Sequence, residues 1–481
     1  FPTRRSSDLS KKASKADYKA GQNVTISKTL TLYAVYKKLP YTVTFNNNNG
    51  TSTSKIYTSL TMYASKNQKV TLPDVPKVKG YTNLGWTTEK GETEPEYSAG
   101  DTVKITKATQ FYAVRRKSNY YTVSYYLGNG STNAAYQKLT QTVEEGTVVT
   151  FAKVPARTGY VNQGWSSKKN SEKATAKAKC TVNKNITLYA VQKKAVQLTF
   201  HRCDGSTWQK TTLAKGSSYS LPGVRDAEGY TFMGWSTKPM QSVSPQYEAE
   251  EKITVNGNVD LYAVVFNRTT ETDLTEDQLP QVDIYKYKQV IFVGDSRTEF
   301  MENVLTGMGE SATKNVKFVC SAGKGLDWFT TTGWAQLYSI VQHDSNSILS
   351  KKTAVIFNFG VNDLSKSADY AEYYNWIAPQ LKSKGCELYF MSVNPVNRLM
   401  LPNAGRADRS EAAVRSFNQY MKANLSSAYT YIDMYSYLKS TGYSFASDHY
   451  GTGTVDDGLH YTTRTYKRIF AKCMDSLRVP A

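Results

Sequence analysis

Hydrophobic and polar residues alternate along short stretches of the first half of the chain. Residues 41–45 (Tyr-Thr-Val-Thr-Phe) and 198–200 (Leu-Thr-Phe) show this period of two, which is typical of strands with one buried face. Each unit of the pattern closes on a further strand-like stretch, such as 185–191, and turns rich in Gly, Pro and Lys lie between. The pattern predicts a region made mainly of short β-strands.

From residue 286 onward, short apolar runs alternate with stretches in which apolar residues recur every three or four positions. The apolar runs lie at 290–293, 316–319, 354–357, 388–391 and 431–433, and the helical spacing at 369–384, 410–425 and 462–477. Strands that alternate with helices in this way favour a parallel sheet with ligands at the carboxyl ends of its strands. We therefore predict a three-layer α/β/α domain over 286–481.

Two motifs recur in the first half of the chain. Gly-Tyr-x-x-x-Gly-Trp ends at Trp86, Trp165 and Trp235, and Tyr-Ala-Val begins at Tyr33, Tyr112, Tyr189 and Tyr262, at spacings of 79, 77 and 73 residues. These spacings predict a partial unit at 10–40 and full repeats at 41–119, 120–195 and 196–266. Because the same Trp recurs in every full unit, we expect it to pack in a core rather than to bind a ligand.

The two motifs resemble those of the Listeria–Bacteroides repeat, also called the internalin B-repeat family, over residues 16–266. The resemblance implies small β-grasp-like modules, mostly β, that serve as spacers or attachment modules in secreted or surface proteins of bacteria, without catalytic residues. The third unit departs from the pattern, since it lacks the Ala-Gly-Asp turn found at 99–101.

The two ends of the repeat region have unusual compositions. Residues 1–9 read Phe-Pro-Thr-Arg-Arg-Ser-Ser-Asp-Leu and resemble a translated sequencing adapter, so we interpret them as an assembly artefact. We then expect the true N-terminus, with any signal peptide, to be missing. Residues 267–285 are crowded with Asp and Glu and contain a proline, which favours an acidic linker.

Residues suited to nucleophilic catalysis follow the predicted strands of the second half. Ser296 lies in Gly-Asp-Ser-Arg at the end of the first strand and at a helix N-terminus, where backbone N–H groups favour negative charge. Asp457 precedes His460 by three residues, so one loop could direct the carboxylate at the imidazole that activates a serine. His449 is the rival base.

Two further strand ends could bind an oxyanion. Asn362, in Gly-Val-Asn-Asp after the third strand, offers an amide, and Gly323 offers a backbone N–H after the second strand, with Gly325 as the alternative. Asp363 is expected to cap the helix that follows its strand. Arg297 could steer an anionic substrate or pair with a surface carboxylate.

Together these motifs resemble the SGNH (GDSL) hydrolase family, over residues 286–481. The resemblance implies a flavodoxin-like fold in which Ser296 is the nucleophile and His460 is the base, oriented by Asp457. It also implies an oxyanion hole formed by Ser296, Gly323 and Asn362. Gly323 lacks the Asn that often precedes it in the family, which makes it the least secure of the assignments. No metal or organic cofactor is implied.

Composition and net charge restrict the kinds of molecule that the chain is expected to bind. The chain has a net charge of +20, of which residues 285–481, with 22 basic and 17 acidic side chains, carry +5 and the remainder +15. Basic repeats suit an anionic cell-wall polymer, and solvated lysines on a spacer are the alternative. No nucleic-acid-binding motif accompanies the charge, no apolar run could span a membrane, and five scattered cysteines form neither a disulfide framework nor a metal site.

The leading hypothesis is a secreted or cell-surface bacterial serine esterase that hydrolyses short acyl esters, such as acetyl esters on polysaccharide. The alternative is a surface adhesin or glycan-binding protein whose terminal domain is non-catalytic or an acyltransferase. Removing residues 1–284 is expected to leave an active fragment if the first hypothesis holds. The sequence does not determine the oligomeric state.

Overall fold

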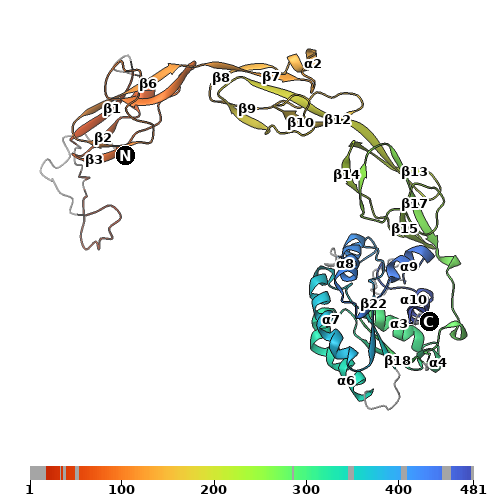
Figure 1. Cartoon of the computed structure of the whole chain (residues 1–481). Coiled ribbons are helices and arrows are strands. Elements are labelled where there is room, and N and C mark those ends of the chain that lie inside the picture. Colours follow the sequence, from red (N-terminus) through yellow and green to blue (C-terminus); the bar gives the residue numbers. More distant parts are fainter. Residues whose placement is uncertain are drawn as a thin grey trace. The chain divides into compact units, whose positions relative to one another are not determined.

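The computed structural model describes residues 18–32, 34–35, 40–48, 54–283, 286–344, 352–401, 409–446 and 457–477. The chain divides into two compact units, of which the first extends to residue 192 and the second comprises 193–481 together with 157–161. The predicted partial repeat at 10–40 contains neither a strand nor a helix among its described residues, and Tyr33 of its motif lies outside them. Figure 1 shows the elements along the chain.

Repeat 1 is a small β module with one short helix. Its elements are β1 (Tyr41–Asn47), α1 (Lys55–Thr58), β2 (Met62–Ala64), β3 (Gln68–Thr71), β4 (Tyr81–Thr87), β5 (Thr102–Ile105) and β6 (Thr109–Lys117). Four strands form a sheet in the order β2-β1-β6-β4, in which the first and last strands of the repeat, β1 and β6, pair in parallel. Strands β3 and β5 form a separate antiparallel pair.

Repeats 2 and 3 reuse this arrangement of strands, but residues 196–266 of repeat 3 contain no helix. Repeat 2 consists of β7 (Tyr120–Tyr126), α2 (Ala134–Gln137), β8 (Gln141–Glu144), β9 (Thr147–Thr150), β10 (Tyr160–Ser166), β11 (Lys179–Val182) and the first half of β12 (Ile186–His201). Repeat 3 consists of the second half of β12, then β13 (Thr207–Ala214), β14 (Ser217–Ser220), β15 (Tyr230–Ser236), β16 (Lys252–Val255) and β17 (Val259–Asn267). The two halves of β12 pair in parallel with β7 and with β17.

The recurring tryptophan fills the core of each repeat, as predicted. Trp86, Trp165 and Trp235 are buried, and each indole N–H donates to a main-chain carbonyl thirteen residues earlier. The preceding glycine is needed because a Cβ on Gly85 would lie 2.2 Å from the carbonyl oxygen of Tyr97. The motif therefore encodes packing rather than a ligand site.

The C-terminal domain contains a five-stranded parallel sheet in the order β19-β18-β20-β21-β22. Its elements are β18 (Tyr287–Gly294), α3 (Ser296–Thr306), α4 (Glu310–Thr313), β19 (Val316–Cys320), α5 (Leu326–Trp328), the π-helical turn Phe329–Gly333, α6 (Trp334–Asp344), β20 (Lys352–Asn358), the 3-10 turn Leu364–Lys366, α7 (Ser367–Lys382), β21 (Cys386–Met391), α8 (Glu411–Asn424), β22 (Tyr429–Ile432), α9 (Met434–Thr441) and α10 (Thr463–Ser476). This strand order is that of flavodoxin-like folds, and the predicted α/β/α architecture is confirmed.

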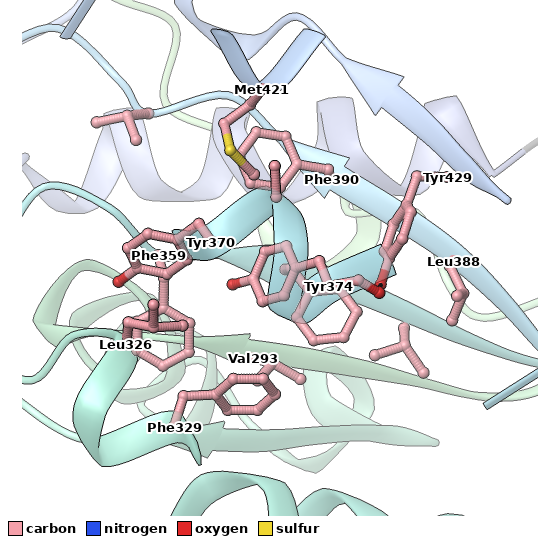
Figure 2. Close-up of a cluster of buried hydrophobic side chains, with 14 of the residues drawn as sticks. Val293, Leu326, Phe329, Phe359, Tyr370, Tyr374, Leu388, Phe390, Met421 and Tyr429 are labelled. Carbon is pink, nitrogen blue, oxygen red and sulfur yellow. Dashed lines mark hydrogen bonds between the residues drawn. The ribbon is translucent and has the colours of Figure 1, made fainter. Parts of the chain in front are cut away.

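Helices cover both faces of the sheet (Figure 1). On one face, helices α6, α7 and α8 bury an aromatic-rich core, and Figure 2 shows Tyr370, Tyr374 and Phe390 packed within it. On the other face, α3, α9 and α10 enclose a second core that includes Met301, Leu438 and Phe470. Two faces buried in this way explain why the strands read as continuous apolar runs.

The segment 267–283, predicted to be an acidic linker, packs against the C-terminal domain. Its side chains Leu279 and Val282 are buried in the same core as α10. Glu271 is buried and accepts a hydrogen bond from Arg468 at 2.9 Å, and Asp273 forms an ion pair with Lys467 at 2.8 Å. Two acidic residues of this segment, Glu271 and Asp273, therefore pair with basic residues of α10.

Candidate active site

The nucleophile candidate lies at a tight turn between strand β18 and helix α3. A Cβ on Gly294 would lie 2.0 Å from Thr298 Oγ1 and 2.9 Å from the carbonyl oxygen of Asn358, so only glycine fits there. Asp295 caps α3 by accepting a hydrogen bond from the Arg297 N–H at 3.0 Å. Ser296 is the first residue of α3, so its N–H has no acceptor within the helix.

Ser296, His460 and Asp457 form a continuous chain of hydrogen bonds. His460 Nε2 lies 2.9 Å from Ser296 Oγ, and His460 Nδ1 lies 2.7 Å from Asp457 Oδ2. All three residues are buried, with Asp457 and His460 exposing only 1% and 3% of their surface. In this arrangement Asp457 holds the imidazole with its Nε2 lone pair directed at the serine hydroxyl.

The loop that carries the histidine is fixed by the same carboxylate. Asp457 Oδ1 accepts hydrogen bonds from the N–H groups of Leu459 and His460, at 2.8 and 2.7 Å. The ring of Phe300, from α3, packs edge-on against the imidazole with a centroid separation of 4.5 Å. The imidazole thus has one orientation, which a general base requires.

The two further oxyanion candidates lie on loops that are bonded to each other. Asn362 Nδ2 donates to the Lys324 carbonyl at 2.7 Å, which leaves one amide hydrogen for another acceptor. Gly323 is exposed at a turn with φ of 70°, and its N–H bonds to no residue of the described part of the chain. These loops follow β19 and β20, the strands on either side of β18. The role of Asn362 and Gly323 in holding an oxyanion stays a prediction.

Packing explains the alternative glycine, Gly325. A Cβ there would lie 2.4 Å from Asp363 Oδ2, because the Asp363 carboxylate accepts a hydrogen bond from the N–H of Leu326 at 2.9 Å. Asp363 thus caps α5 and not the helix after its own strand, so that expectation was wrong. Its second oxygen accepts from the Tyr370 hydroxyl at 2.7 Å, and burial raises the pKa of the carboxyl.

Neither expectation for Arg297 holds, because the side chain is buried, lies over the Tyr461 ring and donates its hydrogen bonds to main-chain carbonyls. Its guanidinium donates to Leu459 at 3.0 Å and to Asn394 and Pro395, each at 2.9 Å. It therefore ties the serine turn to the histidine loop and to the loop after β21. Neighbouring Asp295 is also buried, and burial raises the pKa of its carboxyl to about 6.

Sequence reasoning missed Arg409, a buried residue just before α8. Its Nη2 donates to Asn362 Oδ1, so the amide oxygen is occupied and the Asn362 Nδ2 group is fixed as the donor. No motif marks this arginine in the sequence. The rival base, His449, lies outside the described residues.

The parallel sheet and the Ser–His–Asp geometry define an esterase- or lipase-type hydrolase domain. The chain matches the Listeria-Bacteroides repeat domain at 41–114, 121–191 and 197–264, and the GDSL-like Lipase/Acylhydrolase family at 290–473. It therefore carries three Listeria–Bacteroides repeats followed by a GDSL (SGNH) hydrolase domain.

Two curated proteins of Evansella cellulosilytica, provisionally named a Gly-rich membrane protein and a membrane protein, are each 28% identical, over 48% and 44% of this chain. The chain covers only 26% and 31% of their lengths. In the described part of this chain no helix has the length and apolar character to span a membrane.

Two of the similar solved structures each cover 40% of the chain. One is the acetyl xylan esterase AlAXEase, with 10% identity, 40% of this chain and 100% of that chain covered, and a TM-score of 0.28. Another is the catalytic domain of Streptococcus pneumoniae peptidoglycan O-acetyltransferase A, with 17% identity, 40% and 93% covered, and a TM-score of 0.25.

Proposed function

We propose that this chain is an extracellular serine esterase that removes short acyl groups, acetyl foremost, from polysaccharide. The observation that carries the proposal is the continuous hydrogen-bond chain from Ser296 Oγ through His460 to Asp457. A serine hydroxyl is a weak nucleophile until an oriented base accepts its proton, and this geometry supplies that base.

The reaction uses the side chains already described. His460 Nε2 takes the Ser296 proton as Oγ attacks the ester carbonyl, and Asp457 stabilises the imidazolium. The N–H groups of Ser296 and Gly323 and the free amide hydrogen of Asn362 stabilise the oxyanion. His460 then protonates the leaving alcohol, and water, deprotonated by the same imidazole, releases the acyl group from Ser296.

The openness of the oxyanion side supports a large alcohol. Ala322, Gly323 and Lys324 are all exposed, so the rim beside the predicted oxyanion donors is open to solvent. Such a rim admits a polymer chain. The basic charge of the repeats, +15 outside residues 285–481, supports their role as modules that attach the enzyme to anionic wall polymers.

One observation favours a second candidate, an esterase for longer acyl chains. A groove of about 610 Å³ is lined by residues that include Phe300, Val304 and Met308, and the Phe300 ring contacts the His460 imidazole. An acyl chain could lie on these apolar side chains.

Nitrophenyl acetate, nitrophenyl palmitate and acetylated xylan, each offered to the full chain and to Ser296→Ala, separate the candidates. We expect wild-type turnover of acetate and xylan acetyl groups, and none by the variant. Faster turnover of palmitate would favour the second candidate. Equal, background hydrolysis by both proteins would refute both and leave the adhesin alternative, and acyl transfer to an added polysaccharide would identify an acyltransferase.

A further inference from the structure

Repeat 3 and the hydrolase domain belong to the same compact unit. Met233 and Phe266 of repeat 3 are buried in the hydrophobic core that also holds α9 and α10. A Cβ on Gly442, at the end of α9, would lie 2.2 Å from the Phe266 ring. Repeat 3 thus shares a hydrophobic core with the hydrolase domain.

At Phe266 repeat 3 departs from both other repeats, and at Met233 it departs from repeat 2. Counted from the shared motifs, Met233 corresponds to Leu84 and Gln163, and Phe266 corresponds to Arg116 and Lys193. Repeat 2 therefore carries polar side chains at both positions at which repeat 3 presents buried apolar ones. The exchanges turn a solvated face into one suited to a protein partner.

Ion pairs also join repeat 3 to the hydrolase domain. Glu248 and Glu250 of repeat 3 face basic residues of the hydrolase domain, with Glu248 pairing with Lys439 at 2.9 Å and Glu250 with Arg398 at 2.9 Å. Lys439 is buried and also donates to the carbonyl of Met233 at 2.8 Å. Acidic groups on one side and basic groups on the other specify one docked arrangement.

Glu250 occupies a backbone position that suits glycine. Its φ is 61°, and its N–H donates to Leu221 as the N–H of Gly100 (φ 88°) donates to Leu72 in repeat 1. A glutamate in this left-handed conformation is unfavourable in itself. Its carboxylate offsets that cost by bonding Arg398 and, at 3.3 Å, the N–H of Ala412 at the start of α8. The turn of repeat 3 that lacks the Ala-Gly-Asp sequence thus connects this repeat to the hydrolase domain.

The tethered part of the hydrolase domain is the 394–399 loop, which follows β21. Asn397 Nδ2 donates to Asp226 Oδ1 at 2.8 Å and to the carbonyl of Val224 at 3.1 Å, both in repeat 3. Asp226 is itself fixed by Arg268 at 2.7 Å. Repeats 1 and 2 have Lys77 and Ala156 where repeat 3 has Asp226.

The 394–399 loop also contacts the segment that carries Asp457 and His460. The Asn397 N–H donates to the Gly458 carbonyl at 2.8 Å, and the Tyr461 hydroxyl donates to the Pro395 carbonyl at 2.5 Å. Gly458 and Tyr461 flank His460 on the loop that begins at Asp457. Asn397 therefore connects Asp226 of repeat 3, through hydrogen bonds, to the loop that carries His460.

We propose that repeat 3 is part of the catalytic unit, and that it holds the 394–399 loop through Asn397 and Glu250 so that His460 stays aligned with Ser296. The inference rests on the proposed esterase function, and Asn397 is a positioning residue. Repeats 1 and 2 lack the corresponding side chains and serve as attachment modules only. A fragment that starts at residue 285 lacks these contacts, so, in contrast to the expectation from the sequence, the minimal enzyme includes repeat 3.

The test uses the full chain and three variants. Asn397→Ala removes the bonds to Asp226 and Val224, together with the bond that Asn397 Oδ1 accepts from the Leu399 N–H at 3.2 Å. Glu250→Gly leaves that bond in place and removes the contacts to Arg398 and Ala412 while introducing the glycine that the turn favours, so repeat 3 keeps its fold. The matched control is Asn375→Ala, because Asn375 also joins two elements, accepting from the Ser426 N–H and donating to the Asn424 carbonyl, but does not touch the 394–399 loop.

Two measurements are made on each protein: kcat and KM for nitrophenyl acetate, and hydrogen–deuterium exchange of the Leu459 and His460 amides. We expect Asn397→Ala and Glu250→Gly to lower kcat about tenfold with KM within about twofold, since a small misplacement of a base slows the chemical step. Exchange at the two amides should accelerate about tenfold in the same variants. Asn375→Ala should match the wild type in both.

Each outcome decides the question. Wild-type kcat and wild-type exchange in both variants would overturn the inference, as would an equal effect of Asn375→Ala. If the wild type hydrolyses no ester, the proposed function fails, but the exchange comparison still tests the inference that repeat 3 holds the 394–399 loop. Accelerated exchange confined to Asn397→Ala and Glu250→Gly would then support it, and unchanged exchange would refute it.

Discussion

Replacing Asp457 with asparagine isolates the role of the buried carboxylate. Its two oxygens accept three hydrogen bonds, from His460 Nδ1 at 2.7 Å and from the N–H groups of Leu459 and His460 at 2.8 and 2.7 Å. Asparagine has the same size but only one oxygen. If that oxygen keeps the two main-chain donors, the amide NH₂ faces Nδ1, and the imidazole proton moves to Nε2.

An imidazole with its proton on Nε2 cannot accept the proton of Ser296. We therefore expect Asp457→Asn to lower kcat by about 10⁴-fold, the size of effect that the wrong tautomer has in other serine hydrolases, which corresponds to about 5.5 kcal/mol of barrier. KM should change little, because Asp457 is buried and lies behind the histidine, away from the substrate.

The assay is steady-state hydrolysis of nitrophenyl acetate by the full chain, with thermal unfolding to verify the fold. Asp433→Asn is the matched control, because Asp433 caps α9 by accepting from the Ser436 N–H at 3.1 Å, and asparagine caps equally well. A loss of less than about tenfold in Asp457→Asn, with the control unchanged, would refute the tautomer argument.

Three further predictions concern the neighbouring oxyanion loop, the repeats and pH. Arg409→Ala should lower kcat for nitrophenyl acetate about tenfold at unchanged KM, because the Asn362 amide loses the partner of its oxygen; an unchanged kcat would contradict this. Trp86→Phe removes the bond to the Pro73 carbonyl, and should lower the urea-measured stability of repeat 1 by about 1–3 kcal/mol without altering esterase activity. Burial raises the pKa of Asp295 from 3.8 to about 6, so this carboxyl stabilises the fold below about pH 4 and loses that contribution as pH rises through 6. Urea unfolding at pH 4.5 and pH 7 should show that Asp295→Asn reduces the change in stability between these two pH values by about 2 kcal/mol, and an identical pH dependence would contradict this.

Local patterns predict much of this fold because they record which faces are buried. Strands such as β18 and β20 are covered on both faces, so they appear in the sequence as uninterrupted apolar runs. Parallel strands all end at one edge of the sheet, which is why residues after different strands, such as Ser296 and Asn362, could be assigned to one site.

Contacts between segments that are distant in the chain leave no pattern in the sequence from which they could be predicted. Arg297 bonds to carbonyls at 394, 395 and 459, and Asp363 caps a helix 37 residues earlier in the chain. From the sequence, each side chain could have paired with a residue nearby in the chain. In the structure, each one instead contacts residues that are distant in the sequence. Main-chain carbonyls carry no sequence information, so a bond such as that from Arg297 cannot be read from the sequence.

The role of Glu250 could be predicted from the sequence only in part. The sequence shows that repeat 3 lacks the Gly of the 99–101 turn. Only the structure shows that the glutamate keeps the left-handed conformation and that its carboxylate meets Arg398. A departure from a repeat pattern therefore locates a changed function, while its partner has to come from the fold.

Covalent labelling tests the central claim, that Ser296 is a nucleophile activated by His460, most directly. The full chain is treated with a serine-directed sulfonyl fluoride at pH 7, and its peptides are analysed by mass spectrometry. We predict a single sulfonyl adduct on Ser296 in the wild type, none on Ser296→Ala, and labelling slowed at least a hundredfold in His460→Ala. An unlabelled wild type, or equal labelling of wild type and His460→Ala, would contradict the account.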